Sequence, residues 1–312
     1  MTKGTNMKKL LLALAGAAAF AFAGGAQAAD LPLKAAPAAQ QDISGYMGLY
    51  IGTTWFNQNL PDYGARSEAF VFGGEGRVNY WISPTLSVQM DAEAEVTTAI
   101  NNPPYDSTTD NDGRVHGVFG GHLAMRNPAS HAIAVFGGLS AANNLYHWGG
   151  SGEGQMVHGL IGLEGQLYFN QFTLYGQGGY AGRITGSDTT EPEHLWFIRG
   201  VGRYFYTPND KIQAEVGYAA GPAYNCSGCA TNSITNWGVL YEHRFDSPFS
   251  VYAEYAGFSM DGDSARATEH MVMVGIKAYV NQGTLLANDR NGATFDMPKF
   301  VRALPWSYWV NY

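Results

Sequence analysis

Between residues 45 and 280, the chain consists of short segments in which apolar and polar residues alternate at a period of two. This is the pattern of a β-strand with one apolar face. In the clearest segment, 86–98, the odd positions include Asp91, Glu93 and Glu95, whereas the even positions from Leu86 to Val96 are apolar. Three carboxylates on one face cannot contact lipid at mid-depth, so this face is expected to turn toward a polar interior.

The same alternation recurs along the chain and predicts twelve strands. Their connections alternate between short turns, such as Ser83-Pro84 and Asn170-Gln171, and longer joints at 57–68, 99–113, 143–155, 185–193, 221–233 and 261–267. Outer-membrane barrels have short periplasmic turns and longer outside loops, and an even strand number returns both chain ends to one side. The predicted strands are 45–56, 69–80, 86–98, 114–126, 131–142, 156–169, 172–184, 194–206, 211–220, 234–245, 249–260 and 269–280.

The pattern therefore predicts an all-β fold, a transmembrane antiparallel up-and-down β-barrel with a C-terminal tail. A secreted soluble β-sandwich is the alternative, but it needs neither alternating loop lengths nor an apolar face on nearly every strand. Aromatic residues near the strand ends predict two interfacial girdles. One girdle comprises Tyr80, Trp81, Phe169, Phe172, Tyr206, Phe245 and Phe249, and the other comprises Trp55, Trp148, Trp196 and Trp237.

The segments outside the strand pattern define the remaining organisation. Lys8 and Lys9 precede an apolar run at 10–23 and a small-residue cleavage site ending at Ala28, which predicts a signal peptide over 1–28. The run is too short for a spanning helix, which needs about 20 residues. A Pro- and Ala-rich periplasmic spacer over 29–44 precedes the barrel at 45–280. The tail, 281–312, loses the alternation and is a periplasmic segment, a lumen plug or an extra strand.

The start of the mature chain has a recognisable sequence. Ala29-Asp30-Leu31-Pro32 is followed by a Tyr- and Gly-rich strand at 45–52. This start resembles that of small outer-membrane and porin-family proteins of alphaproteobacteria. The resemblance implies a β-barrel in the bacterial outer membrane.

Composition and charge exclude some partners and fold classes. Only 14% of the residues are charged, and removing the signal peptide changes the net charge from −8 to −11 because that segment holds three lysines and no acid. A nucleic-acid partner is therefore not expected. The mean hydropathy of −0.17 excludes a helical membrane bundle. The expected partners are outer-membrane lipid and small polar solutes, and the sequence does not indicate the oligomeric state.

The predicted inward faces hold nine acids and nine bases. One interpretation is a narrow porin-like channel for small polar solutes, with facing acidic and basic walls. The other is a structural barrel whose closed lumen is filled by ion pairs and supports envelope integrity. The lumen-lining residues are Glu75, Arg77, Asp91, Glu93, Glu95, Arg114, Arg126, Glu164, Arg183, Arg199, Arg203, Lys211, Glu215, Glu242, Arg244, Glu254, Glu269 and Lys277.

Cys226 and Cys229 are the two cysteines of the chain and lie in a predicted outside loop. In an exported protein this pair predicts a small loop disulfide. A redox role needs a thiol activated at a helix start, and a metal site needs more ligands than two thiols. We therefore predict neither a metal site nor a cofactor.

An outer-membrane lipid hydrolase is the second alternative function. Gly262-Asp263-Ser264 is similar to a hydrolase nucleophile motif, but it lies in a loop without the strand–turn–helix context. His243 and His270 are predicted to face outward, and neither has a serine at a suitable position. We therefore predict no enzymatic activity and no catalytic residue.

Overall fold

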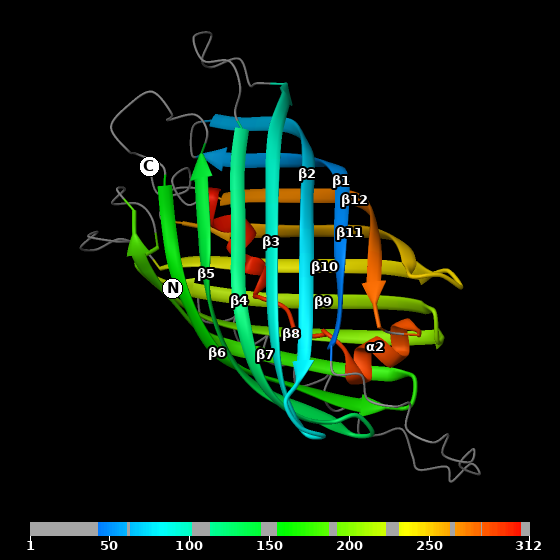
Figure 1. The fold of residues 1–312 in the computed structure, drawn as a ribbon. Coiled ribbons are helices and arrows are strands. Elements are labelled where there is room, and N and C mark those ends of the chain that lie inside the picture. Colours follow the sequence, from blue (N-terminus) through cyan, green and yellow to red (C-terminus); the bar gives the residue numbers. More distant parts are fainter. Residues whose placement is uncertain are drawn as a thin grey trace, which may run out of the picture. The chain divides into compact units, whose positions relative to one another are not determined.

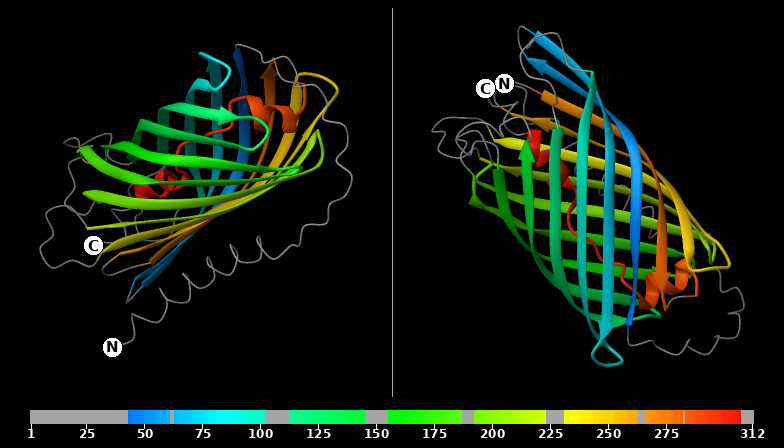
Figure 2. Two further views of the ribbon diagram at one scale, coloured as in Figure 1. Left: turned by 90° about the horizontal axis from the view of Figure 1, so that it is seen from below. Right: turned by 45° about the horizontal axis from the view of Figure 1, so that its top comes forward.

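The protein forms a closed barrel of twelve antiparallel strands (Figures 1 and 2). This computed structural model describes residues 43–60, 63–101, 113–144, 155–186, 192–222, 231–262, 266–281 and 283–306. Each strand pairs with its neighbour in sequence, and β12 pairs with β1 to close the barrel, which confirms the predicted fold class. The strands are β1 Ile43–Leu60, β2 Tyr63–Trp81, β3 Leu86–Asn101, β4 Gly113–Asn127, β5 His131–Asn144, β6 Gln155–Phe169, β7 Phe172–Thr185, β8 His194–Thr207, β9 Asp210–Gly221, β10 Asn232–Arg244, β11 Phe249–Asp261 and β12 Arg266–Val280.

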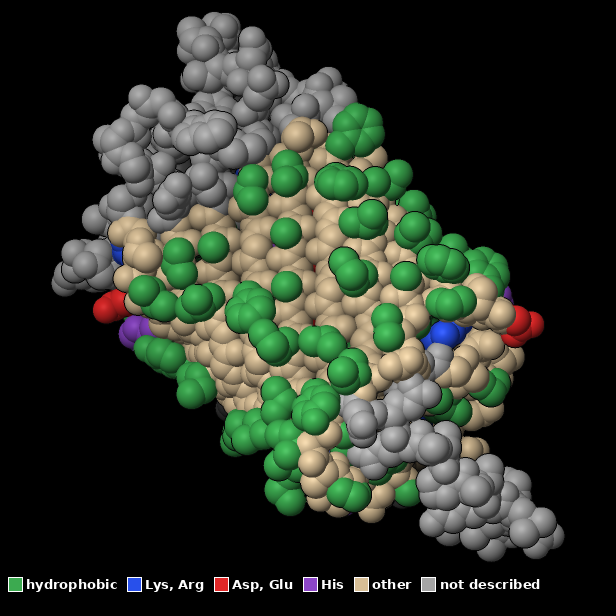
Figure 3. All heavy atoms as spheres, in the orientation of Figure 1, with side chains coloured by type: hydrophobic (Ala, Val, Ile, Leu, Met, Phe, Trp, Pro, Cys, Tyr) green, Lys and Arg blue, Asp and Glu red, His purple; other side chains and the backbone are tan. Residues whose placement is uncertain are grey.

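Exposure alternates along each strand, as the sequence pattern requires. On β3, Met90 is 47% exposed, whereas Asp91 and Glu95 are each 7% exposed. The outer surface accordingly carries apolar side chains spread over the strands, with few charges between them (Figure 3). A face of this kind is suited to contact with lipid hydrocarbon.

The short connections follow from their turn residues. Between β6 and β7, only Asn170 and Gln171 separate the paired residues Phe169 and Phe172. Asn170 has a φ of 46°, in the left-handed region that asparagine adopts more readily than most residues. The sequence at this turn therefore fixes the register of the hairpin.

The first predicted outside joint is wrong. Residues 57–68 do not form a long connection, because β1 continues to Leu60 and β2 begins at Tyr63. Their main chains stay paired to the end, with Asn57 opposite Arg66. Main-chain pairing continues here beyond the apolar alternation, so short and long connections do not alternate throughout. At the other end β1 begins at Ile43, two residues before the predicted start of the barrel.

The girdle position predicted for Trp81 is also wrong. Trp81 is 5% exposed and turns inward, since it shares the odd-numbered face of β2 with Asn79. Its indole N–H donates to the carbonyl of Asn291 at 2.8 Å. The other girdle prediction for β2, Tyr80, is exposed at 52%.

After β12 the chain enters the barrel. The short helix α2, Leu285–Asn291, begins at the N-cap Thr284, whose hydroxyl accepts the N–H of Ala287 at 3.0 Å. Its Leu286 N–H donates to the carbonyl of Pro208, which places α2 at the end of the barrel that has the short turns. An extended stretch then leads to the 3-10 helix η2, Lys299–Trp306 (Figure 2).

The second half of this segment packs into an apolar part of the lumen. Phe300, Val301 and Leu304 are at most 2% exposed, and the ring centroids of Phe300 and Phe197 are 5.1 Å apart. Of the three places left open for the tail, residues 285–304 take the lumen. We call this segment the lumen segment. Across the described residues, no helix has both the length and the apolar character to cross a bilayer.

Candidate functional site

The barrel interior is the candidate site, because it gathers the charged side chains that the sequence placed on the polar faces. None of the predicted lumen-lining residues lies among the exposed positions, and most are in hydrogen bonds or ion pairs with other parts of the chain. The most buried of them, at 8% exposure or less, are Asp91, Glu95, Arg126, Glu164, Arg199, Arg203, Glu242, Arg244, Glu269 and Lys277.

On the side formed by β9–β12, several charges pair within the barrel wall or with Glu75 of β2. Glu242 is opposite Lys211 in the β9–β10 register, and the Lys211 ammonium lies 2.7 Å from its carboxylate. Lys277 is 3.8 Å from the same carboxylate and 3.1 Å from that of Glu75. Tyr279 also donates to Glu242 at 2.6 Å. These ion pairs therefore form without the lumen segment.

On the side formed by β2–β8, the lumen segment supplies the partners. The Asp296 carboxylate accepts two hydrogen bonds from the Arg199 guanidinium, at 2.7 and 2.9 Å, and lies 3.6 Å from Arg77. Burial alone would raise the pKa of the Asp296 carboxyl, but Arg199 and Arg77 outweigh it and hold the pKa well below its usual range. Near α2, Asp289 pairs with Arg203 at 2.9 Å.

The basic residues of η2 pair with acids of β3. Lys299 and Arg302 lie 2.7 and 2.6 Å from the Glu93 carboxylate, and Arg302 is 3.3 Å from Glu95. Burial would lower the pKa of the Lys299 ammonium, but the nearby Glu93 outweighs it and raises the pKa. The segment therefore remains charged and bound at neutral pH.

His122 anchors the middle of the lumen segment. One ring nitrogen lies 2.7 Å from Asp91 and the other 2.5 Å from Glu164. The second oxygen of Asp91 accepts the N–H of Met297 at 3.0 Å. The Phe295 ring stacks on the imidazole with centroids 5.7 Å apart. Because two carboxylates hold the ring in one orientation, the imidazole is a fixed platform for the segment.

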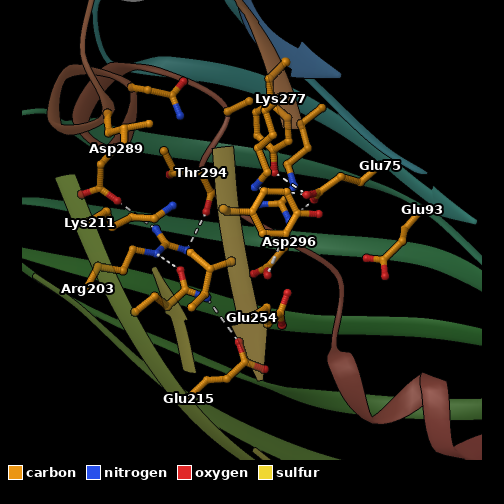
Figure 4. Close-up of a pocket in the computed structure, with 18 of the residues that line it drawn as sticks. Glu75, Glu93, Arg203, Lys211, Glu215, Glu254, Lys277, Asp289, Thr294 and Asp296 are labelled. Carbon is orange, nitrogen blue, oxygen red and sulfur yellow. Dashed lines mark hydrogen bonds and ion pairs between the residues drawn. The ribbon is translucent and has the colours of Figure 1, made fainter. Parts of the chain in front are cut away.

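A cavity of about 60 Å³ remains between the lumen segment and β9–β12 (Figure 4). A single water needs roughly 10–15 Å³ measured in this way, so the cavity has room for a few waters. A smaller cavity lies beside Trp237 and Phe258, and four residues line both: Glu215, Glu254, Lys299 and Arg302. We call the two cavities together the passage; their lining comes from β9–β12, from β1–β3 and β8, and from the lumen segment.

The remaining predicted positions divide into two groups. Cys226, Cys229, Asp263 and Ser264 lie outside the described residues, so the disulfide stays a prediction. His243 and His270 lie on the outer side of the wall. His243 is 2.7 Å from Asp210, and His270 is 2.8 Å from the Tyr255 hydroxyl.

The strand pattern does not identify the charged residues of the lumen segment. Asp289, Asp296, Lys299 and Arg302 contact the interior, yet they lie in a stretch without strand alternation. One feature of the sequence could have indicated that the tail lies in the lumen. It is the mixture of acidic and basic residues with Phe295, Met297 and Phe300 in a short segment. That composition suits an environment with apolar and ionic parts.

Comparisons with known proteins agree with the fold. No protein-family model matches the chain, and no curated protein matches its sequence. Among solved structures it is similar to the COG4313 outer membrane channel from Pseudomonas putida F1, with 12% identity, 80% of this chain and 100% of that chain covered, and a TM-score of 0.59. It is also similar to a TodX monoaromatic hydrocarbon channel mutant, with 9% identity, 78% and 91% coverage and a TM-score of 0.44. The KdgM porin gives 9% identity, 73% and 98% coverage and a TM-score of 0.41.

At this level of identity the first of these similarities shows the fold, which is that of a bacterial outer-membrane barrel. The apolar outer surface is the second observation, because a soluble barrel would not expose Met90, Ile161 and Val274 at about half of their area or more. The protein is an outer-membrane β-barrel. Its strands face lipid on the outside and a charged lumen on the inside.

Proposed function

We propose that the protein is a narrow outer-membrane channel for small polar solutes, with its own lumen segment occupying most of the bore. The observation that carries this proposal is the passage beside β9–β11. A barrel built only to be filled has no need to leave a cavity with charged walls between the filling segment and β9–β12. Such a cavity holds water and hydrated solutes rather than apolar ones.

The lumen segment sets the size of the solute. Residues 292–298 are buried between α2 and η2, and their hydrogen bonds go to β2–β8. Solutes are therefore confined to the opposite side, where both signs of charge line the cavity. This arrangement favours small solutes and excludes large ones.

A structural barrel is the second candidate. The cavity holds only a few waters, and buried ion pairs such as Arg199–Asp296 fix the segment within the lumen. If the passage is not continuous, the ion pairs serve to make the barrel rigid and the protein supports the envelope without transport.

Planar-bilayer recording of the purified full chain separates the two candidates. We expect small, stable conductance steps. A256W places a large ring on the inward, buried position of β11 that lines the passage, and it should reduce the conductance. A253W makes the same change at an exposed, outward position of β11 and should conduct like the original protein. Folded but silent protein, as judged by heat-modifiable migration on a gel, would leave the structural barrel as the function.

A further inference from the structure

Among the residues that the structure describes, one carboxylate that lines the passage forms no hydrogen bond or ion pair. Glu254 of β11 lines both cavities, and it makes no hydrogen bond or ion pair with the residues that the structure describes (Figure 4). All other charged residues that line the larger cavity take part in ion pairs. They are Glu75, Arg77, Glu93, Arg203, Lys211, Glu215, Lys277, Asp289, Asp296, Lys299 and Arg302.

The register explains why Glu254 is left alone. Its neighbours across the two strand interfaces are Leu240 and Met273, which have no charge to offer. Glu242, one strand away, is directly opposite Lys211 instead and forms the ion pair that Glu254 lacks. The sheet thus places an acid on the passage wall and provides no basic residue beside it.

The nearest cations, Arg302 and Lys299 of the lumen segment, attract the Glu254 carboxylate but form their ion pairs elsewhere. Lys299 and Arg302 line the same cavities, but the Lys299 ammonium contacts Glu93 and the Arg302 guanidinium contacts Glu93 and Glu95. A charged group away from bulk water is costly unless water or a counter-charge accompanies it. In a cavity with room for a few waters, either a hydrated cation or the cationic group of a solute meets this need.

We propose that Glu254 is the cation-recognising residue of the passage, so that the channel favours inorganic cations and small solutes bearing an ammonium or guanidinium group over anions. This inference rests on the proposed channel function and adds to it the charge class of the solute. The contact is direct, because the Glu254 carboxylate lies on the wall where the two cavities meet.

The test is the reversal potential of the full-length protein in a planar bilayer under a KCl gradient. We expect the original protein to prefer K⁺ over Cl⁻ and E254Q to lose that preference severalfold, because Gln keeps the shape and removes the charge. Methylammonium should permeate better than acetate through the original protein, and this difference should disappear in E254Q. E68Q is the matched control, because it removes the same charge from an exposed position on β2 and should behave like the original protein.

A second variant keeps the test independent of how E254Q folds. L240K provides the cross-strand ammonium that Glu254 lacks, on the pattern of Lys211 and Glu242, and should abolish the cation preference while leaving Glu254 intact. Unchanged selectivity in conducting E254Q or L240K channels overturns the inference and leaves the channel function standing. A folded but silent original protein overturns both.

Discussion

The two sides of the lumen differ in how their charges are satisfied. On β2–β8, Arg77, Arg199 and Arg203 find their partners on the lumen segment. On β9–β12, Lys211 and Lys277 find theirs within the barrel wall, and the described residues 285–304 make no hydrogen bond or ion pair to these strands. One side is therefore a docking surface, and the other borders the passage.

This difference shows how a single chain both fills a barrel and leaves a way through it. A segment bound equally on all sides would occupy the whole bore. Among the described residues, its ion pairs go to β2, β3 and β8, and the cavity remains between the segment and β9–β12. The same asymmetry leaves Glu254 without an ion pair among the described residues, since the segment's cations form theirs with Glu93 and Glu95.

Loss of the central docking contact should have the largest effect. D296A leaves Arg199 and Arg77 without this partner, and breaking a buried ion pair costs about 3–5 kcal/mol. We expect the lumen segment to become sensitive to protease and the conductance to rise. E242Q, which disrupts ion pairs of the opposite wall, should leave the segment protected. Equal protease sensitivity in both variants would show that the two sides do not differ.

Acid should release the same contact. The Asp296 carboxyl has its pKa held well below its ordinary 3.8, so its stabilising contribution is complete above that pH and is lost as the pH falls from 3.8 through the lower value in the folded protein. Conductance should be measured at successive pH values. Asp296 should cause no change between pH 7 and pH 4, and the conductance should rise below pH 4. D296N should lack this rise. A rise near neutral pH that D296N abolishes would contradict the assignment.

An intermediate effect is expected from the outer face of a docking strand. Ala92 lies on β3 between Asp91 and Glu93 and is exposed. A92R places a charge against lipid at a cost of roughly 2–4 kcal/mol near the midplane. We expect less folded, heat-modifiable protein in the outer membrane. E93Q should still assemble and should only loosen Lys299 and Arg302. Normal assembly of A92R would show that the faces of β3 are inverted.

The smallest effect should come from crowding the segment. A Cβ added to Gly120 would lie 2.2 Å from the sulfur of Met297, so the Met297 side chain must move. We expect G120A to cost about 1–3 kcal/mol, as overpacking does, and to increase protease sensitivity of the segment slightly. G176A changes an exposed glycine that has no atom within 4 Å of an added Cβ. It should match the original protein in thermal unfolding, and a similar loss in both variants would contradict the close packing at Met297.

Most of the fold could be predicted from the sequence because strand alternation is a local property. The carboxylates at Asp91, Glu93 and Glu95 identified the inner face of β3, and the turn residues at Asn170-Gln171 marked a hairpin. Two local predictions were wrong. The pairing at 57–68 continues without apolar alternation, and Trp81 was assigned by residue type although its odd-numbered position on β2 directs it inward.

The alternating pattern predicts twelve strands and the inner face of most of them, because a period of two depends only on neighbouring residues. What fills the interior depends on contacts between distant parts of the chain. Arg199 and Asp296 are separated by 97 residues, and Gln89 and Phe295 by 206, so no local pattern links them. The passage and the isolated position of Glu254 follow from the same cause, since the closed barrel and the returning chain together decide which charges meet.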